Sequence, residues 1–128
     1  MKALLDTHTV LWYLQGHPNL SVRARETIEQ KANVLYFSIA SFWEIAIKSG
    51  LGKLQLQRPF RDLEADLTQL EIQTLSITFA DTETYLSLPL HHRDPFDRIL
   101  VAQAMNHSLP FVSQDAQLDA YPIKRLWQ

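Results

Sequence analysis

Four acidic side chains stand where apolar segments of the chain end or begin, namely Asp6, Glu44, Asp97 and Asp115. A carboxylate beside a buried segment is costly unless a cation or hydrogen-bond donors compensate it. The sequence has no cysteine, which excludes thiolate ligands and thiol nucleophiles. Carboxylate oxygens without sulfur favour Mg²⁺ or Mn²⁺ over softer metals. The acids therefore predict a divalent-metal site, whose ion would suit the hydrolysis of a phosphodiester.

Two of these acids follow predicted strands. The apolar run at residues 3–5 stops at Asp6, and the run at residues 111–113 comes just before Asp115. Strands and helices alternate along the sequence, which predicts a parallel sheet covered on both faces. The carboxyl ends of such strands lie on one rim of the sheet, so these two acids should lie close together. For each acid alone, capping the next helix is an equally good explanation.

Asp97 carries the strongest prediction from pattern alone. Asp94, followed by a proline, is expected to cap a helix over residues 95–107. Asp97 heads an apolar stripe on that helix, formed by Leu100, Val101 and Ala104. A first-turn acid that complements the helix dipole explains an exposed position better than a buried one. We therefore expect a functional role for Asp97 and only a capping role for Asp94.

Glu44 has a competing structural explanation. It lies three residues after Ser41, which is the spacing of a capping box, and four before Lys48. The apolar residues of the same predicted helix form a separate face, at Ile39, Trp43, Ala46 and Ile47. Periodicity therefore favours a solvated Glu44–Lys48 pair over a site residue.

The remaining pattern completes an α/β domain over residues 1–128. Further strands are predicted at 34–37, 73–77 and 123–127. Further helices are predicted at 9–15, 21–32, 38–49, 60–70 and 78–88. We expect a three-layer α/β/α fold, in which helices cover both faces of a central, mostly parallel sheet of four to five strands.

Composition excludes several classes of function. The net charge of −2 gives no broad positive field for nucleic acid. There is no signal peptide and no apolar stretch long enough for a membrane span, so a cytoplasmic protein is expected. Walker A and G-x-G-x-x-G motifs are absent, and the histidines lack zinc-site spacing. His91 and His92 are expected in a polar loop.

Longer motifs carry a family resemblance along nearly the whole chain. They are LLDTHT at 4–9, SFWEIAIK at 41–48, GKL at 52–54, LPLHHRDPFDR at 88–98, AQA at 102–104, Asp115, and LW at 126–127. In these segments the chain resembles the PIN-domain ribonucleases, and specifically the VapC-like toxins of type II toxin–antitoxin systems.

The resemblance implies a PIN-like fold and a metal-dependent endoribonuclease. It places Asp6, Glu44, Asp97 and Asp115 in one acidic site for Mg²⁺ or Mn²⁺, with the Ser113 hydroxyl nearby. It thereby overturns the interpretation of Glu44 as a solvated pair. It also implies a homodimer, an RNA substrate, and a cognate antitoxin whose tail covers the acidic pocket.

Three alternatives remain open on sequence grounds. A PIN-fold protein could bind RNA or an antitoxin without cleaving. A haloacid-dehalogenase phosphatase would use Asp6 as its nucleophile, but it needs a second acid where His8 stands. A receiver-like phospho-acceptor would need an acid pair and a late lysine that are not evident.

Overall fold

The computed structural model describes residues 1–128. The strands are β1 (Lys2–Leu5), β2 (Val34–Ser38), β3 (Ile72–Leu75), β4 (Phe111–Val112) and β5 (Arg125–Leu126). The α-helices are α1 (Thr7–Gln15), α2 (Val22–Glu29), α3 (Ile39–Gly50), α4 (Leu63–Gln69), α5 (Phe79–Ser87) and α6 (Pro95–Asn106). Two short 3₁₀ helices complete the fold, at Phe60–Asp62 and Ala116–Ala120.

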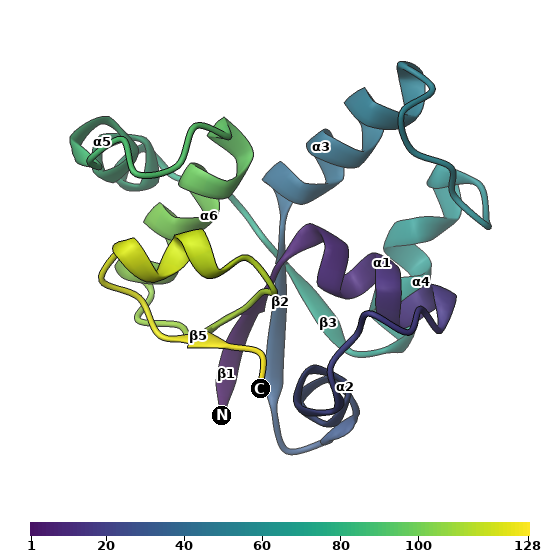
Figure 1. Cartoon of the computed structure of the whole chain (residues 1–128). Coiled ribbons are helices and arrows are strands. Elements are labelled where there is room, and N and C mark those ends of the chain that lie inside the picture. Colours follow the sequence, from purple (N-terminus) through teal and green to yellow (C-terminus); the bar gives the residue numbers. More distant parts are fainter.

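The five strands form one sheet in the order β3-β2-β1-β4-β5, and every neighbouring pair is parallel. The prediction of a parallel α/β sheet with four to five strands is confirmed. In Figure 1, α5 and α6 lie on one side of the sheet, while α1, α2 and α4 lie on the other. The expected three layers are therefore present.

Alternate side chains of the central strands enter two separate cores. Leu5, Phe37 and Val112 belong to the core shared with α1, α2 and α4. Leu4 and Phe111 belong to the core shared with α6. Each of these side chains is fully buried, and such burial contributes about 2 kcal/mol per side chain. Because both faces of β1 and β4 are buried, their carboxyl ends have fixed positions.

Several element boundaries differ from the predicted ones. α1 begins at Thr7 rather than residue 9, because the Asp6 carboxylate accepts a hydrogen bond from the Thr7 backbone and caps the helix. Gly50 stays inside α3, and a left-handed turn follows at Gly52 (φ 70°). Thr78 caps α5 in a full capping box with Asp81.

The carboxyl rim of the sheet is where the chain can place chemistry. α3 leaves this rim from β2 and contacts both α1 and α6, so it bridges the two helical layers. Figure 1 shows α3 rising from the end of β2 above the start of α1. None of the helices has the length and apolar character needed to cross a membrane.

Candidate active site

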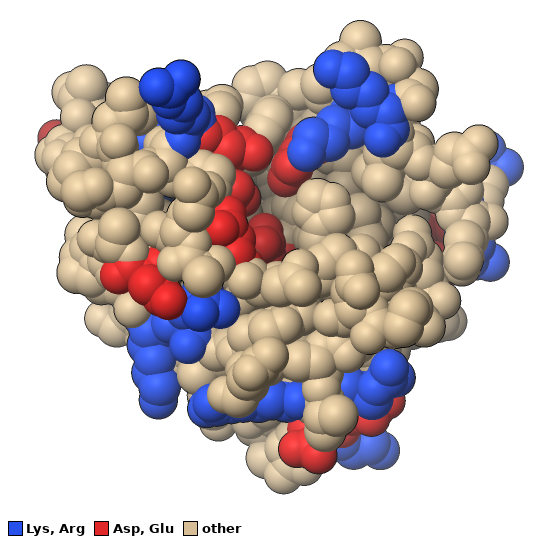
Figure 2. Space-filling model, viewed as in Figure 1, with Lys and Arg blue, Asp and Glu red and all other residues tan.

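A hollow of about 410 Å³ opens at the carboxyl rim of the sheet, between α1, α3 and α6. Its charged wall consists of Asp6, Glu44, Lys48, Asp94, Asp97 and Asp115. Figure 2 shows acidic side chains gathered in a hollow near the middle of this face, with basic side chains at its rim. The structure therefore brings together the four acids singled out from the sequence.

Asp6 is held rigidly by two donors. Its Oδ1 accepts from the Thr7 backbone N–H at 2.8 Å, and its Oδ2 accepts from the Ser113 hydroxyl at 2.8 Å. Ser113 comes directly after β4, so this bond joins the ends of two neighbouring strands. Burial raises the pKa of the Asp6 carboxyl, although both hydrogen bonds oppose the shift. The cap expected for a lone Asp is present, together with a second contact that a cap does not explain.

Glu44 is buried, which corrects the prediction of a solvated pair. The Lys48 partner is real, with 2.6 Å between Nζ and Oε2, but Glu44 itself is only 3% exposed. Its Oε1 lies 2.8 Å from the Thr7 hydroxyl, which donates because a carboxylate can only accept. Thr7 also lies 2.8 Å from the buried Ser41 hydroxyl. Glu44 thus points into the hollow from a network that joins α1 to α3.

The buried face of α3 is not its most apolar face, which is why the pattern predicted a solvated Glu44. The apolar stripe of α3 was expected to be buried, yet Ile39, Trp43 and Ile47 are 44%, 62% and 37% exposed. The buried face carries Ile45 together with the polar Ser41 and Glu44. Periodicity identified the two faces of α3 but assigned them to the wrong sides.

Asp97 occupies an unfavourable electrostatic position in the hollow. Burial raises its pKa from 3.8 to about 8, and the neighbouring carboxylates of Asp6, Asp94, Glu44 and Asp115 add to the shift. Without a cation, Asp97 therefore keeps its proton at neutral pH.

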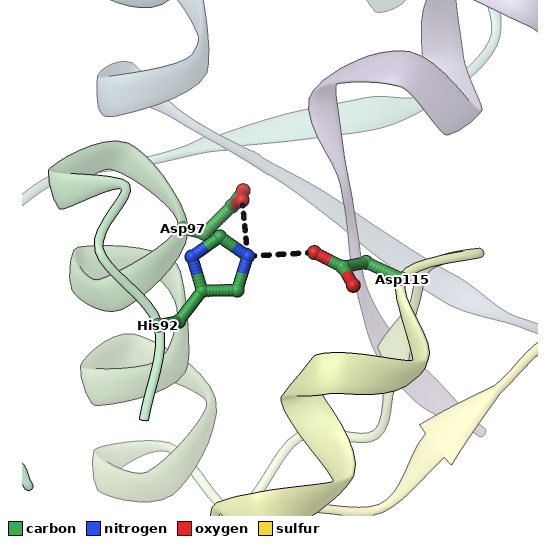
Figure 3. A group of neighbouring side chains, drawn as sticks. All are labelled: His92, Asp97 and Asp115. Atoms are coloured by element: carbon green, nitrogen blue, oxygen red, sulfur yellow. Dashed lines mark hydrogen bonds and ion pairs between the residues drawn. The ribbon is translucent and has the colours of Figure 1, made fainter. Parts of the chain in front are cut away.

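Asp115 meets a histidine that the sequence did not single out. Its Oδ2 lies 2.7 Å from His92 Nε2, and Asp97 Oδ2 lies 3.3 Å from the same nitrogen. Figure 3 shows the His92 ring between the two carboxylates, which come from α6 and from the start of the last 3₁₀ helix. His92 does lie in a loop, as expected, but it points into the site. The one available signal was its place inside the HHRDPFDR motif.

Asp94 is confirmed as the N-cap of α6. Its Oδ1 accepts from the backbone of Phe96 at 2.8 Å and of Asp97 at 3.4 Å. It also lines the hollow, so its charge acts on the site although its oxygen is engaged. Burial lowers the pKa of Lys48, but the hydrogen bond and the negative charge of Glu44 raise it by more. The charges of Asp94 and Asp97 add to this effect, so the pKa of Lys48 is raised overall. Lys48 therefore keeps its charge at the rim.

The donor set fits a hard divalent cation. The hollow presents carboxylate oxygens from four chain segments and no sulfur. The repulsion that raises the Asp97 pKa is the repulsion that a cation would relieve. Asp97, Asp115 and His92 offer ligand-type atoms within 4.8 Å of one another. Oxygen-rich sets of this kind suit Mg²⁺ or Mn²⁺.

A parallel sheet in the order β3-β2-β1-β4-β5, with acids gathered on its carboxyl rim, is consistent with one known class of domain. The family model described as PIN domain matches residues 3–124 of the chain. The chain belongs to the PIN-domain family. This membership disfavours the dehalogenase-like and receiver-like alternatives.

Individual relatives are similar over nearly the full length. Ribonuclease VapC22 of Mycobacterium tuberculosis is 29% identical over 119 residues, which is 92% of this chain and 90% of that protein. The structure of VapBC2 from Rickettsia felis, bound to a DNA fragment from their promoter, superposes with a TM-score of 0.76 at 16% identity, covering 100% of both chains. FitAcB from Neisseria gonorrhoeae superposes with a TM-score of 0.64 at 19% identity, covering 98% of this chain and 96% of that one. At these identities the two structures show a shared fold.

Proposed function

We propose that this protein is a metal-dependent endoribonuclease that acts as the toxin of a type II toxin–antitoxin pair. The observation that carries the proposal is the convergence of Asp6, Glu44, Asp97 and Asp115 on one rim of a PIN-domain sheet. The similarity to a protein named as a ribonuclease supports RNA as the substrate. In this proposal the protein acts on RNA in the cytoplasm.

In this proposal each side chain has a defined task. Asp6, Asp97 and Asp115 hold Mg²⁺ or Mn²⁺, and Ser113 keeps the Asp6 carboxylate aimed at the ion. When bound, the ion would polarise the scissile phosphate and make an attacking water more acidic. Glu44, kept in place by Thr7 and Lys48, completes the set and orients that water. The cation also offsets the repulsion between an acidic hollow and a polyanionic substrate.

The partner in this proposal is a cognate antitoxin. The solved structures with the same fold include VapBC2 from Rickettsia felis and a toxin–antitoxin complex from Klebsiella pneumoniae. An antitoxin that covers the hollow would exclude RNA and ion together. Lys48 is the only lysine or arginine among the residues that line the hollow, so an antitoxin that covers it would supply a cation of its own to neutralise the acids.

The direct test is RNA cleavage by the purified chain with and without metal. We expect cleavage with Mg²⁺ or Mn²⁺, none in EDTA, and recovery when the metal is restored. Asp6→Asn should slow the reaction about 100-fold or more, equivalent to losing about 3 kcal/mol of transition-state stabilisation. Glu83→Gln, an exposed acid on α5, is the matched control and should cleave normally. RNA that binds but stays intact under all conditions would favour the non-cleaving alternative.

The exposed face of α3 supports a homodimer. Trp43 is 62% exposed and packs edge-on against Phe96 of α6, with Ile39 and Ile47 one helical turn to either side. Exposed apolar residues that adjoin one another in this way are typical of protein interfaces. We expect Trp43→Glu to shift the purified chain from dimer to monomer in sedimentation velocity. Val22→Glu, a control at a 71% exposed position on α2, should stay dimeric, and a wild-type chain that sediments as a monomer would contradict the proposal.

A further inference from the structure

His92 is the one side chain that lies within ion-pair distance of the carboxyl groups of two of the four acids. Its Nε2 lies 2.7 Å from Asp115 Oδ2 and 3.3 Å from Asp97 Oδ2. The His92 side chain is only 11% exposed, so its ring is largely withdrawn from solvent. The role of His92 depends on whether this nitrogen carries a hydrogen, which it can donate to a carboxylate, or a free lone pair, which could bind a metal ion.

The contact of the other ring nitrogen, Nδ1, shows where the ring hydrogen lies. The Asp94 backbone N–H donates to His92 Nδ1 at 3.1 Å. A backbone N–H can only donate, so Nδ1 carries no hydrogen and the ring hydrogen is on Nε2. In this tautomer Nε2 has no free lone pair for a metal ion. His92 therefore faces Asp97 and Asp115 as a hydrogen-bond donor.

The backbone of the loop fixes the position of the ring. The Tyr121 hydroxyl accepts from the backbone N–H of His91 at 3.2 Å and of His92 at 3.1 Å, and it donates to the Pro89 carbonyl at 2.8 Å. Tyr121 is only 3% exposed. The loop before α6 is thus tied to the buried tyrosine, and His92 does not depend on the carboxylates for its placement.

The other acids have their own donors. Asp6 is held by Ser113 and by the Thr7 backbone, and Glu44 by Thr7 and Lys48. The carboxylate of Asp97 has no side-chain partner other than His92. His92 is thus the one side chain that links the Asp97 carboxyl group to that of Asp115.

We propose that His92 is a positioning residue, which donates its Nε2 hydrogen to Asp115, keeps the same edge of the ring against Asp97 and so holds both carboxyl groups in place for the divalent cation. The inference rests on the proposed function, because it concerns the same metal. Groups that orient metal ligands in this way typically change metal affinity or activity by about 10- to 100-fold when removed.

Two substitutions of His92 separate the contact of Nδ1 with the Asp94 backbone from the hydrogen that Nε2 donates to Asp115. His92→Asn keeps an oxygen near the place of Nδ1, where it can accept from Asp94, but has no atom near Nε2. His92→Gln reaches farther and can bring an amide N–H near the place of Nε2. Mn²⁺ affinity of the purified chain, measured by electron paramagnetic resonance of the free ion, reports on the site directly. The melting temperature in EDTA reports on folding alone.

We expect His92→Asn to weaken Mn²⁺ binding about 10- to 100-fold while its melting temperature in EDTA stays near that of the wild type. We expect His92→Gln to recover most of the affinity. RNA cleavage by His92→Asn should need more Mn²⁺ to reach half its maximal rate, with a smaller effect on the maximal rate itself. A purely structural role would instead lower the melting temperature of both variants.

Three results would overturn the inference. The first is wild-type Mn²⁺ affinity in His92→Asn. The second is tighter binding, because His92 would then compete with the ion. The third is a nitrogen-14 coupling in pulsed resonance spectra of the wild-type Mn²⁺ complex that disappears in His92→Gln, since it would make His92 a ligand. Failure of the proposed function is distinguishable, because in that case the wild-type chain itself would neither bind Mn²⁺ nor cleave RNA.

Discussion

Replacing Asp97 with Asn should greatly slow RNA cleavage and, at the same time, make the metal-free protein more stable above neutral pH. The two effects have one cause. Burial, with the neighbouring acids adding to it, raises the pKa of Asp97 from 3.8 to about 8, so ionising it in the folded protein is costly. Asn removes that cost, but it also removes a carboxylate from the proposed metal site. We expect cleavage to fall about 100-fold or more, as for loss of about 3 kcal/mol of metal-derived stabilisation.

The sign of the pH effect follows from the direction of the shift. The folded chain binds a proton at Asp97 more tightly than the unfolded chain does. The stability contributed by that proton is fully present below about pH 4 and is lost as the pH rises through about 8. Relative to wild type, Asp97→Asn should therefore gain stability with rising pH and level off above pH 8. At about 1.4 kcal/mol per pKa unit, we expect a gain of about 2–4 kcal/mol after relaxation of the site.

Urea unfolding in EDTA at several pH values between 5 and 9 measures this gain. Glu83→Gln is the control, because Glu83 is exposed on α5 and lies outside the acidic hollow. Its stability difference from the wild type should stay near zero at every pH. If the Asp97→Asn difference were also independent of pH, Asp97 would not be the strained acid of the site.

Divalent metal should stabilise the protein, and more so at pH 8.5 than at pH 6. A cation that binds only the folded chain adds about 2.7 kcal/mol when its concentration is 100 times the dissociation constant. Below the Asp97 pKa of about 8, protons compete with the ion for that carboxylate. The competition weakens binding by up to about tenfold for each pH unit below that pKa, about 1.4 kcal/mol.

Melting curves with and without Mg²⁺ or Mn²⁺ at the two pH values measure this linkage. In a chain of this size, 2.7 kcal/mol corresponds to a rise of roughly 8–15 °C in melting temperature. In Asp97→Asn the increase in stabilisation between pH 6 and 8.5 should be lost. Equal stabilisation of the wild type at both pH values would mean that the ion does not bind at Asp97.

The sequence predicts the fold well, together with the positions of two of the acids on the rim of the sheet, and the reason is physical. Buried parallel strands give apolar runs, and each run must end on the rim where Asp6 and Asp115 stand. Asp97 could also be singled out, because it heads an apolar stripe on α6. These predictions depend on local pattern and on the geometry that all parallel sheets share.

Glu44 and His92 depend on tertiary contacts that no local pattern contains. α3 carries apolar residues on both faces. The apolar stripe at Ile39, Trp43 and Ile47 faces solvent, so periodicity predicted the wrong side for Glu44, which is buried. The family resemblance placed Glu44 in the site where the pattern did not. His92 meets Asp115, 23 residues away, only because the Tyr121 hydroxyl holds its loop.

The shortest elements were predicted least accurately. β4 and β5 have two residues each, and their pairing depends on register with β1 rather than on their own sequence. The last strand was predicted over 123–127 but covers only Arg125–Leu126. The helix predicted over 60–70 begins with a 3₁₀ turn at Phe60–Asp62, and its α-helical part is Leu63–Gln69.

The chemistry of the cleaved RNA ends tests the central claim most directly. A defined RNA is cut by the wild-type chain and by Asp6→Asn, in Mg²⁺ and in EDTA, and the new ends are mapped. If the acids serve a metal-assisted attack by water, wild type in Mg²⁺ should leave linear phosphate and hydroxyl ends, with solvent oxygen in the phosphate. Asp6→Asn in Mg²⁺ should cut the RNA more slowly, by about 100-fold or more. Either protein in EDTA should leave the RNA intact. Ends bearing a 2′,3′-cyclic phosphate, formed equally well in EDTA, would contradict the account.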